Sequence, residues 1–422
     1  RGRFYNRNAF FRLIPELTHR FNSDTVARYS LGFGRDWFRI EIGDIYLATR
    51  NYNFDAKTEL EHRFAPSWVG FFGADLHYIY FDYDFSFPRV VQTGTGAGFT
   101  ISSQERLKAN VKMNSTVPAI YTRQEWKPGE GPLTLIPGAR LEYFNLTREA
   151  VPQPRAAARY QLTESLRLRT AGGLYVQVPQ PNEIDAVLGN PDLKTERSWH
   201  YTLGAEQDFR GGTTRGFIVS SDFFYKPMSR LVIGSSKLVT RNGNLTPENF
   251  SNEGAGKAFG LSSMIRLEAH PFNGWISYTF SRSTRTEPGR GTHLFQFDQT
   301  HILSVLSSVV LAENWTFGAR VRLVSGNPTT PILGGIWDSD ADRYQSETGP
   351  FYSERLSPFF ALDFRVDRKW VFENWIFSAY ADIQNATNQK NREAVRYSYD
   401  YSQKEEIAGL PILPTLGVKG EF

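Results

Sequence analysis

The chain has 422 residues, no cysteine and a formal net charge of +4. The absence of cysteine excludes thiol catalysis, disulfides and cysteine-ligated zinc, and so small a charge gives no argument for nucleic-acid binding. No run approaches the roughly 18 consecutive apolar residues of a membrane-spanning helix. Aromatic residues nevertheless make up 15% of the chain, while its mean hydropathy is −0.41. A sheet with one face in lipid and the other in water reconciles the two values.

Strict alternation of apolar and polar residues predicts long antiparallel strands along the chain. In Trp315–Leu323, for example, the odd positions are apolar and the even positions are polar or small. Successive side chains of a strand point to opposite faces, so each such segment has one apolar and one polar face. The first strand is expected near residues 8–20, and the clearest later segments are 135–142, 166–169, 276–281, 315–323, 360–367 and 375–384.

The predicted connections between strands alternate in length. Short turns are expected near 22–24, 65–67, 127–131, 163–164, 211–213, 271–274, 312–314 and 372–374. Long polar connections are expected at 86–103, 178–195, 229–252, 283–293, 326–354 and 385–411. Long strands with short turns on one side and long loops on the other are typical of outer-membrane barrels. The strands of a soluble antiparallel sandwich or a propeller also alternate apolar and polar residues, so these are the alternative folds.

Tryptophan positions give independent support for a membrane. Six of the nine tryptophans lie within a few residues of a predicted short turn: Trp68, Trp126, Trp275, Trp315, Trp370 and Trp375. Indole prefers the headgroup level of a bilayer, so this pattern predicts an aromatic girdle on the periplasmic side.

The turns and loops together predict about 17 strands. The predicted fold class is therefore all-β, an antiparallel transmembrane β-barrel. Traced back from the C-terminus, the first strand runs towards the periplasm, whereas single-chain bacterial barrels have even strand numbers and both termini in the periplasm. We therefore expect that residues 1–422 form one barrel domain and that the first strands and a plug domain precede residue 1.

Five segments resemble the motifs of TonB-dependent receptors, in the order of that family. They are Gly189–Ser198 (GNPDLKTERS), Phe297–His301 (FDQTH), Leu135–Tyr143, Asp382–Asn388 and the terminal Leu410–Phe422. The first departs from the family pattern at Thr195, where proline is usual. The resemblance covers about residues 130–422, and the first hundred residues match in pattern only.

The resemblance implies the C-terminal part of a plugged barrel of about 22 strands in the bacterial outer membrane. It also implies import of a scarce nutrient, such as a siderophore, vitamin, sugar or peptide, with TonB as partner through a plug that this sequence does not show. A structural or assembly barrel, or a passive pore that anchors partners, is the alternative function. The barrel assembly machinery is a further implied partner, because Thr415, Gly417 and the terminal Phe422 are similar to its signal. Alternatively, Phe422 merely ends a lipid-facing strand.

Charged residues fall on the predicted inward faces of the strands. In a large barrel such charges must be solvated by water or paired with a plug or with each other. Salt bridging within the wall or to a plug is one reading, and steering of an anionic substrate is the other. The residues are Arg140, Arg167, Arg169, Arg320, Arg322 and Arg365, with Glu142, Asp363, Asp367 and Asp382.

The connection 326–354 holds a candidate ligand site in which acids are flanked by rings: Trp337, Asp338, Asp340, Asp342 and Tyr344. An EF-hand calcium loop is not expected, because Arg343 and Gly349 stand where glycine and glutamate are required. The seven histidines lack metal-ligand spacing, and no serine lies in a nucleophile-elbow sequence. We therefore expect no metal, no cofactor and no enzymatic activity, and a small nutrient as ligand.

Overall fold

The computed structural model describes residues 4–43, 45–88, 106–186, 188–241, 243–340 and 342–422. In this part of the chain the backbone forms 25 strands and one short helix, α1 (Pro181–Ile184). The strands are β1 (Phe4–Leu13), β2 (Glu16–Arg20), β3 (Thr25–Ile42), β4 (Ile45–Ala65), β5 (Trp68–Pro88), β6 (Arg106–Trp126), β7 (Leu133–Phe144), β8 (Glu149–Gln161), β9 (Leu166–Gln177), β10 (Glu196–Asp208), β11 (Gly216–Arg241), β12 (Asn244–Ala269), β13 (Phe272–Glu287), β14 (Gly291–Leu294), β15 (His301–Ala312), β16 (Trp315–Val324), β17 (Pro328–Thr329), β18 (Ile332–Asp338), β19 (Arg343–Thr348), β20 (Glu354–Arg355), β21 (Phe359–Val371), β22 (Ile376–Gln384), β23 (Arg392–Tyr397), β24 (Lys404–Ala408) and β25 (Leu413–Glu421).

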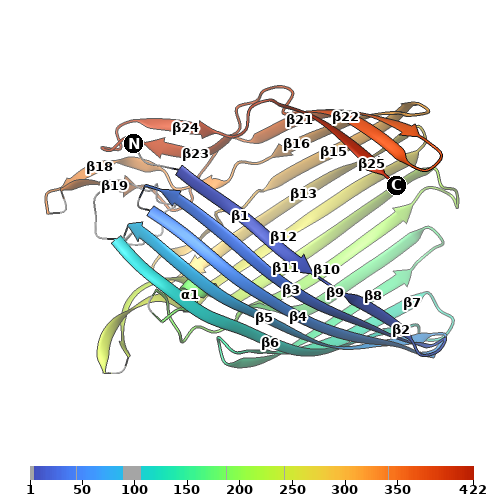
Figure 1. Cartoon of the computed structure of the whole chain (residues 1–422), viewed down its shortest axis with the longest axis horizontal. Helices are drawn as coiled ribbons and strands as arrows, with labels where there is room; N and C mark the ends of the chain where they lie inside the picture. The colour runs from blue at the N-terminus through green and yellow to red at the C-terminus, as the bar shows by residue number, and fades with distance from the viewer. Residues whose placement is uncertain (1–3, 44, 89–105, 187, 242, 341) are drawn as a thin grey trace. The chain divides into compact units, whose positions relative to one another are not determined.

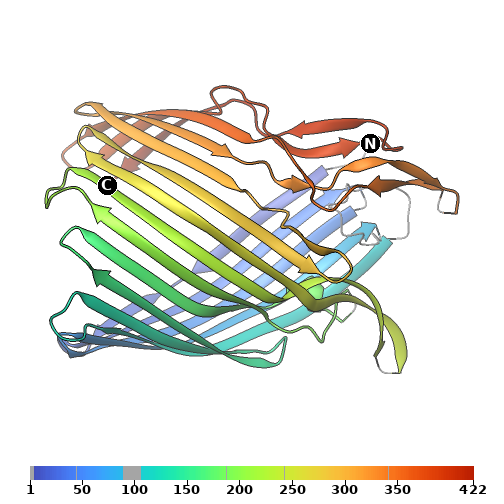
Figure 2. The same ribbon diagram turned by 180° about the vertical axis from the view of Figure 1, so that it is seen from behind.

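Nineteen of these strands belong to one sheet, and β17–β20, β18–β19 and β23–β24 form three separate two-stranded pieces (Figures 1 and 2). Among the described residues, no helix is long and apolar enough to cross a membrane. The all-β, antiparallel architecture predicted from the alternation is confirmed.

The first predicted strand is divided in two. β1 and β2 lie in line along β3, with the break at Ile14 and Pro15. Proline has no N–H to donate to a ladder, although Pro15 O accepts a 3.1 Å hydrogen bond from Leu31 N. β14 is a four-residue strand beside the end of β13. Counting β1 with β2, and setting β14 aside, leaves 17 long strands among the described residues of the sheet, as predicted.

The chain divides into two compact units. The first comprises Arg1–Tyr160, Ala171–Tyr201 and Pro227–Ala255, and the second comprises Gln161–Thr170, Thr202–Lys226 and Gly256–Phe422.

In the first unit, β3 pairs with β4 along all 18 of its residues. Every second side chain in the middle of β3 is large and apolar, and Tyr29, Leu31 and Phe33 are each between 41 and 44% exposed. Exposed apolar side chains at alternate positions are what the outer face of a strand in lipid requires. Near the turn between β4 and β5, the Trp68 indole stacks on Phe64 at 4.5 Å.

In the second unit, β13, β15, β16, β21, β22 and β25 pair antiparallel in that order. Arg320 of β16 lies opposite Asp363 of β21. On the other face of the same two strands, the rings of Phe317 and Phe364 stack at 5.8 Å. The alternation of 315–323 and 360–367 is therefore confirmed as two faces of different polarity.

The predicted short turns fall between strand ends, except that the one expected at 271–274 lies at 270–271, because β13 begins at Phe272. The prediction of a loop at 229–252 is wrong, because β11 runs to Arg241 and β12 begins at Asn244. Likewise, 283–293 contains the end of β13 and the start of β14. Backbone pairing does not need apolar side chains, so polar residues continue a hairpin beyond the apolar band. The predicted connection 86–103 lies, from residue 89 on, outside the described residues.

Candidate functional site

The Asn190 segment, residues 189–198, lies at the strand ends away from the short turns, and it follows helix α1. Asn190, Leu193 and Thr195 are almost fully buried, at 6%, 1% and 0% exposure. Asn190 N donates a 2.7 Å hydrogen bond to Glu183 O of α1. A Cβ on Gly189 would lie 1.9 Å from that same oxygen, so only glycine permits this approach.

Glu149, the first residue of β8, holds the Asn190 segment in place. One carboxylate oxygen accepts hydrogen bonds from Thr195 N at 2.7 Å and from Thr195 Oγ1 at 2.9 Å. Its other oxygen lies 3.1 Å from an Arg230 guanidinium nitrogen and 3.7 Å from one of Arg197. Burial raises the pKa of Glu149, but the Thr195 bonds and the two guanidinium groups outweigh it and keep that pKa below its usual value.

The β11–β12 hairpin holds the same segment from a second side. Asn190 Nδ2 donates to Phe250 O at 2.7 Å, and Arg241 Nη2 donates to Asn190 Oδ1 at 2.6 Å. The Asn252 amide bonds Lys194 through both its atoms, accepting from Lys194 N at 2.6 Å and donating to Lys194 O at 3.0 Å. The β11–β12 hairpin, which the sequence predicts to be a loop, therefore helps to hold the Asn190 segment in place.

A second buried centre, in the second unit, lies at the FDQTH motif. The Asp298 side chain is fully buried and pairs with the Arg355 guanidinium of β20. Asp298 Oδ1 also accepts a 2.6 Å hydrogen bond from Ser283 N. Arg355 donates further to Asp298 O at 2.6 Å, to Gly326 O at 2.9 Å and to Thr300 Oγ1 at 2.9 Å. One arginine therefore fastens both ends of the 326–354 connection to the motif.

The Asp382–Asn388 motif forms a third fixed point. Asp363 Oδ1 accepts a 2.8 Å hydrogen bond from Asn385 N, while its other oxygen pairs with Arg320 at 2.6 Å. Asn385 Nδ2 donates to Gln389 O at 3.0 Å and to Leu410 O at 3.2 Å. The 385–411 connection is thereby closed at its base.

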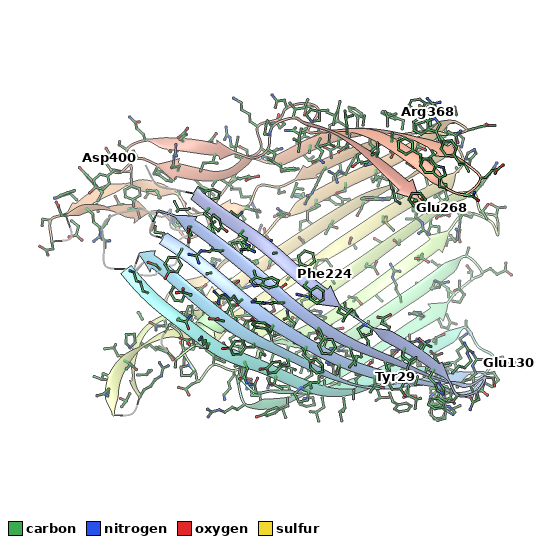
Figure 3. The ribbon with its side chains drawn as sticks, viewed as in Figure 1. Tyr29, Glu130, Phe224, Glu268, Arg368 and Asp400 are labelled. Carbon is green, nitrogen blue, oxygen red and sulfur yellow. The ribbon has the colours of Figure 1, made fainter. Side chains whose placement is uncertain are left out.

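The predicted ligand residues lie together on the β18–β19 hairpin of the second unit. Trp337 and Tyr344 are opposite each other in its ladder, and their rings make an edge contact at 5.0 Å. Tyr344 also makes an edge contact at 5.6 Å with Tyr399, from the β23–β24 turn where Figure 3 labels Asp400. Within the turn, Asp338 Oδ1 accepts a 3.1 Å hydrogen bond from Asp340 N. Trp337 is 47% and Tyr399 58% exposed.

Most of the predicted inward charges have partners on the same face of the sheet. Arg140 bonds Asp75 at 3.0 Å and Glu142 at 2.6 Å, Arg167 lies 3.5 Å from Glu206, Arg169 bonds Asp222 at 2.5 Å, Arg365 bonds Asp367 at 2.7 Å, and Asp382 accepts from Gln384 at 3.2 Å. Arg322 instead lies over the Phe359 ring at 5.6 Å. Wall-to-wall pairing accounts for these contacts without a substrate, and a role in steering stays a prediction.

The terminal strand β25 carries the predicted assembly residues. Phe422 is fully exposed, and its ring lies 6.0 Å from that of Trp375 in a stacked orientation. A Cβ on Gly417 would lie 2.3 Å from the Tyr380 ring, so glycine makes room for that ring. Thr415 Oγ1 lies 3.4 Å from Asp382. A function in assembly stays a prediction.

Sequence reasoning singled out the motifs but missed the residues that fasten them, namely Glu149, Arg230, Asn252 and Arg355. The available signal was weak, since each is a single polar residue. Glu149 begins β8 and Arg355 ends β20, whereas Arg230 and Asn252 lie within β11 and β12. In the described residues, no group of three or more histidine, aspartate or glutamate side chains is arranged to hold a metal.

Comparisons with known proteins agree on the architecture. Residues 2–386 match the family described as TonB dependent receptor-like, beta-barrel. No curated protein matches the chain in sequence. Among solved structures, the outer membrane transporter YddB from Escherichia coli is 14% identical with a TM-score of 0.70, and the match covers 99% of this chain and 65% of that one.

Two further solved structures are from other organisms. The ferripyoverdine receptor of Pseudomonas aeruginosa is 12% identical, with a TM-score of 0.73 and coverage of 99% of this chain and 57% of that one. The siderophore receptor PiuA from Acinetobacter baumannii is also 12% identical, with a TM-score of 0.69 and coverage of 99% and 65%. At such identities the likeness shows the fold alone, and this chain spans less than two thirds of each structure.

Proposed function

Because the chain belongs to the TonB-dependent receptor-like β-barrel family, we propose that it forms the barrel of an importer that takes up a scarce nutrient. The family's barrels lie in the bacterial outer membrane, and the family consists of transporters, not enzymes. In the proposal, TonB supplies the energy through a plug domain and lipid surrounds the apolar face of the sheet.

The observation that carries this proposal is the fastening of three family motifs at the strand ends away from the short turns. Glu149 holds the Asn190 segment, Arg355 holds Asp298, and Asp363 holds Asn385. Loops that recognise ligands work best when a rigid scaffold positions them. A fixed base under these three connections therefore favours a ligand-binding role over a passive pore or an anchoring barrel.

We propose a ferric siderophore as the first substrate class to test, ahead of vitamins, sugars and peptides. Two of the solved structures above are receptors for such ligands, by their descriptions. In this chain the exposed rings of Trp337 and Tyr399, with Tyr344 between them, offer flat apolar surface outside the membrane. Rings of this kind bind planar or ring-bearing ligands at low entropic cost. In this proposal Asp338, Asp340 and Asp342 form the turn beside these rings, where Asp338 accepts a 3.1 Å hydrogen bond from Asp340 N.

Insertion into the outer membrane is proposed to depend on the terminal strand and the barrel assembly machinery. Phe422 is fully exposed at the end of β25, and its ring stacks with that of Trp375. In the proposal this ring is recognised before the strand is placed. Deleting Phe422 should lower the heat-modifiable, membrane-inserted fraction at unchanged transcript level.

The decisive experiment is uptake by a strain that lacks the gene and is complemented with its full-length copy. Radiolabelled ferric catecholate, hydroxamate and citrate chelates are supplied at nanomolar concentration, with and without an uncoupler of the proton gradient. Energised import predicts uptake that needs the gene and stops with the uncoupler. Uptake unaffected by the uncoupler would support a passive pore. No gene-dependent uptake of any iron chelate, vitamin, sugar or peptide would support an anchoring role.

A further inference from the structure

The lipid-facing side of β3, in the first unit, changes from apolar to basic near the middle of the strand. The alternate side chains that end with Phe33 are large and apolar, and the next three on the same face are Arg35, Trp37 and Arg39. A tilted strand crosses the apolar core of a membrane in about 9–11 residues. Counted from Thr25, beside the short turn, that length ends near Arg35. The basic residues therefore lie at the headgroup level, on the side of the membrane away from the short turns.

The strands on both sides of β3 add arginines to the same face (Figure 1). Residues that are directly opposite each other in a ladder share a face, and Arg50 of β4 lies opposite Trp37. On the other side, Arg7 of β1 lies directly opposite Arg39. Two like charges at directly opposite positions destabilise a sheet. An anion bound between the two guanidinium groups removes that cost.

The carboxylates on this face leave much of the positive charge without a partner. Glu41 Oε1 accepts a 2.5 Å hydrogen bond from Arg39 Nε. Asp82 of β5 lies opposite Arg50, but it accepts a 3.3 Å hydrogen bond from Asn110 Nδ2 instead. In the described part of the chain, Arg50 is exposed and has no carboxylate partner. The other charged side chains that the structure describes on this face beyond the apolar band are Asp84, Lys108 and Lys112.

Aromatic rings, and no acid, place the Arg35 guanidinium. Its central carbon lies 4.1 Å from the centroid of the Trp37 ring and 4.9 Å from that of Tyr52. Its Nε is buried and has no hydrogen-bond partner among the described residues. Rings hold the plane of a guanidinium by cation–π contact and leave its charge uncompensated. A group held in this way is ready to bind a planar or tetrahedral anion through two nitrogens.

We propose that Arg35, Arg39 and Arg50, together with Arg7, bind the phosphate of a lipid headgroup in the leaflet on the loop side of the membrane. Arginine binds phosphate through two parallel hydrogen bonds, and clustered basic residues at a membrane surface recognise anionic lipids. The apolar band that ends at Phe33 receives the acyl chains of the same lipid.

A single arginine at this level would only extend its head towards water. Four arginines on three adjacent strands, two of them directly opposite each other, form a site for one multivalent headgroup. The site lies on the lipid-facing side of the sheet, so it is separate from the proposed import route and does not depend on what the barrel transports.

Lipid binding by the full-length protein tests the proposal. The protein in detergent is titrated with phosphatidic acid, whose headgroup is a phosphate monoester, or with phosphatidylcholine, and bound lipids are counted by native mass spectrometry. Phosphatidic acid should bind at least about tenfold more tightly, because several arginines attract its charge. Inorganic phosphate at the same concentrations should not compete, because it has no acyl chains to place against the apolar band. Equal binding of the two lipids would overturn the proposal, and displacement by inorganic phosphate would show a site for a soluble anion instead.

Charge-removing variants locate the site. Arg35→Gln with Arg50→Gln should reduce the preference for phosphatidic acid about tenfold, whereas lysine at both positions should retain part of it, because the charges remain and only the paired hydrogen bonds are lost. The matched control is Arg20→Gln with Arg63→Gln, which removes two charges near the short turns from the other face of the sheet. An unchanged preference in the first glutamine pair would overturn the proposal, as would an equal loss in the control pair. Heat-modifiable migration on gels confirms that each variant is folded.

Discussion

The Asn190 segment and the β18–β19 hairpin are both connections between strands, yet they are built in opposite ways. In the Asn190 segment, Asn190, Leu193 and Thr195 are buried, and polar bonds hold the segment to β8, β11 and β12. The β18–β19 hairpin exposes its rings, and Leu333 and Ile336 are 67% and 60% exposed. The polar groups of the Asn190 segment are satisfied by other strands of the chain. The β18–β19 hairpin instead leaves apolar surface that a ligand or partner could cover.

The difference separates the scaffold from the surface that we propose for ligand recognition. Three of the five motifs that resemble the receptor family coincide with the buried polar centres at Asn190, Asp298 and Asn385, where a substitution would leave an unsatisfied charge or amide. The exposed rings of the β18–β19 hairpin can change without that penalty. A receptor family can therefore keep one barrel rim and vary its ligands.

The largest expected effect comes from Asp298→Ala. Arg355 would keep its backbone bonds but lose a carboxylate that is fully buried, and Ser283 N would lose its acceptor. Breaking a buried ion pair from one side costs about 3–5 kcal/mol. Urea unfolding in phospholipid vesicles, followed by tryptophan fluorescence, measures the change. Asp340→Ala, in the exposed turn of the hairpin, should change the same free energy by less than about 0.5 kcal/mol, and similar losses in both variants would erase the distinction between the regions.

Substitutions on the two faces of β21 measure how strongly each face contributes to the stability of the sheet. Phe364→Arg would place a charge on the apolar face, beside Phe317, at a cost of about 2–4 kcal/mol in the middle of a bilayer. Arg365→Lys, on the opposite face, keeps a charge that pairs with Asp367 and should cost much less. The same vesicle unfolding experiment applies to both. Equal costs would mean that the two faces have been assigned the wrong way round.

Most of the fold could be predicted because alternation is a local signal that each strand carries by itself. The segments 315–323 and 360–367 reveal both faces without knowledge of their partners. The break at Pro15 follows from the missing N–H of proline, which interrupts the ladder between β1 and β2. The strands within 229–252 were missed because, beyond the apolar band, both faces of a hairpin are polar and the alternation disappears.

The fastening residues could not be predicted for a different reason. Arg355 meets Asp298 across 57 residues, and Arg230 meets Glu149 across 81. Such pairs depend on the register of strands far apart in the chain, and a single arginine looks the same whether it is fixed or solvated. Motif resemblance located Asn190 and Asp298, and only the structure supplies their partners.

A smaller and pH-dependent effect is expected for Glu149→Gln. Glutamine keeps an acceptor for Thr195 but loses the charge opposite Arg230 and Arg197, so the variant should lose about 1–2 kcal/mol at pH 7. Because the pKa of Glu149 is lowered in the folded chain, its stabilisation is complete above the unfolded value near 4.5 and is lost as the pH falls through the folded value. The difference between parent and variant should therefore shrink as the pH falls below about 4.5, the unfolded value. Glu164→Gln, at a short turn, is the control, and a difference that is constant with pH would rule out the charge as its source.

The smallest effect on stability, and the largest on binding, is expected for Trp337→Ala. Its indole contacts Tyr344 at one edge and is otherwise half exposed, so its loss should change the free energy of unfolding by less than about 1 kcal/mol. If the exposed rings receive the ligand, affinity for the imported iron chelate should fall at least about tenfold, as for an aromatic anchor. Concentration-dependent uptake by whole cells measures this as a raised half-saturation constant at unchanged amounts of protein. Leu333→Ala removes a more exposed apolar side chain from the same hairpin and should leave that constant unchanged. An unchanged constant in Trp337→Ala would move recognition to another connection and leave the β18–β19 hairpin without a role in binding.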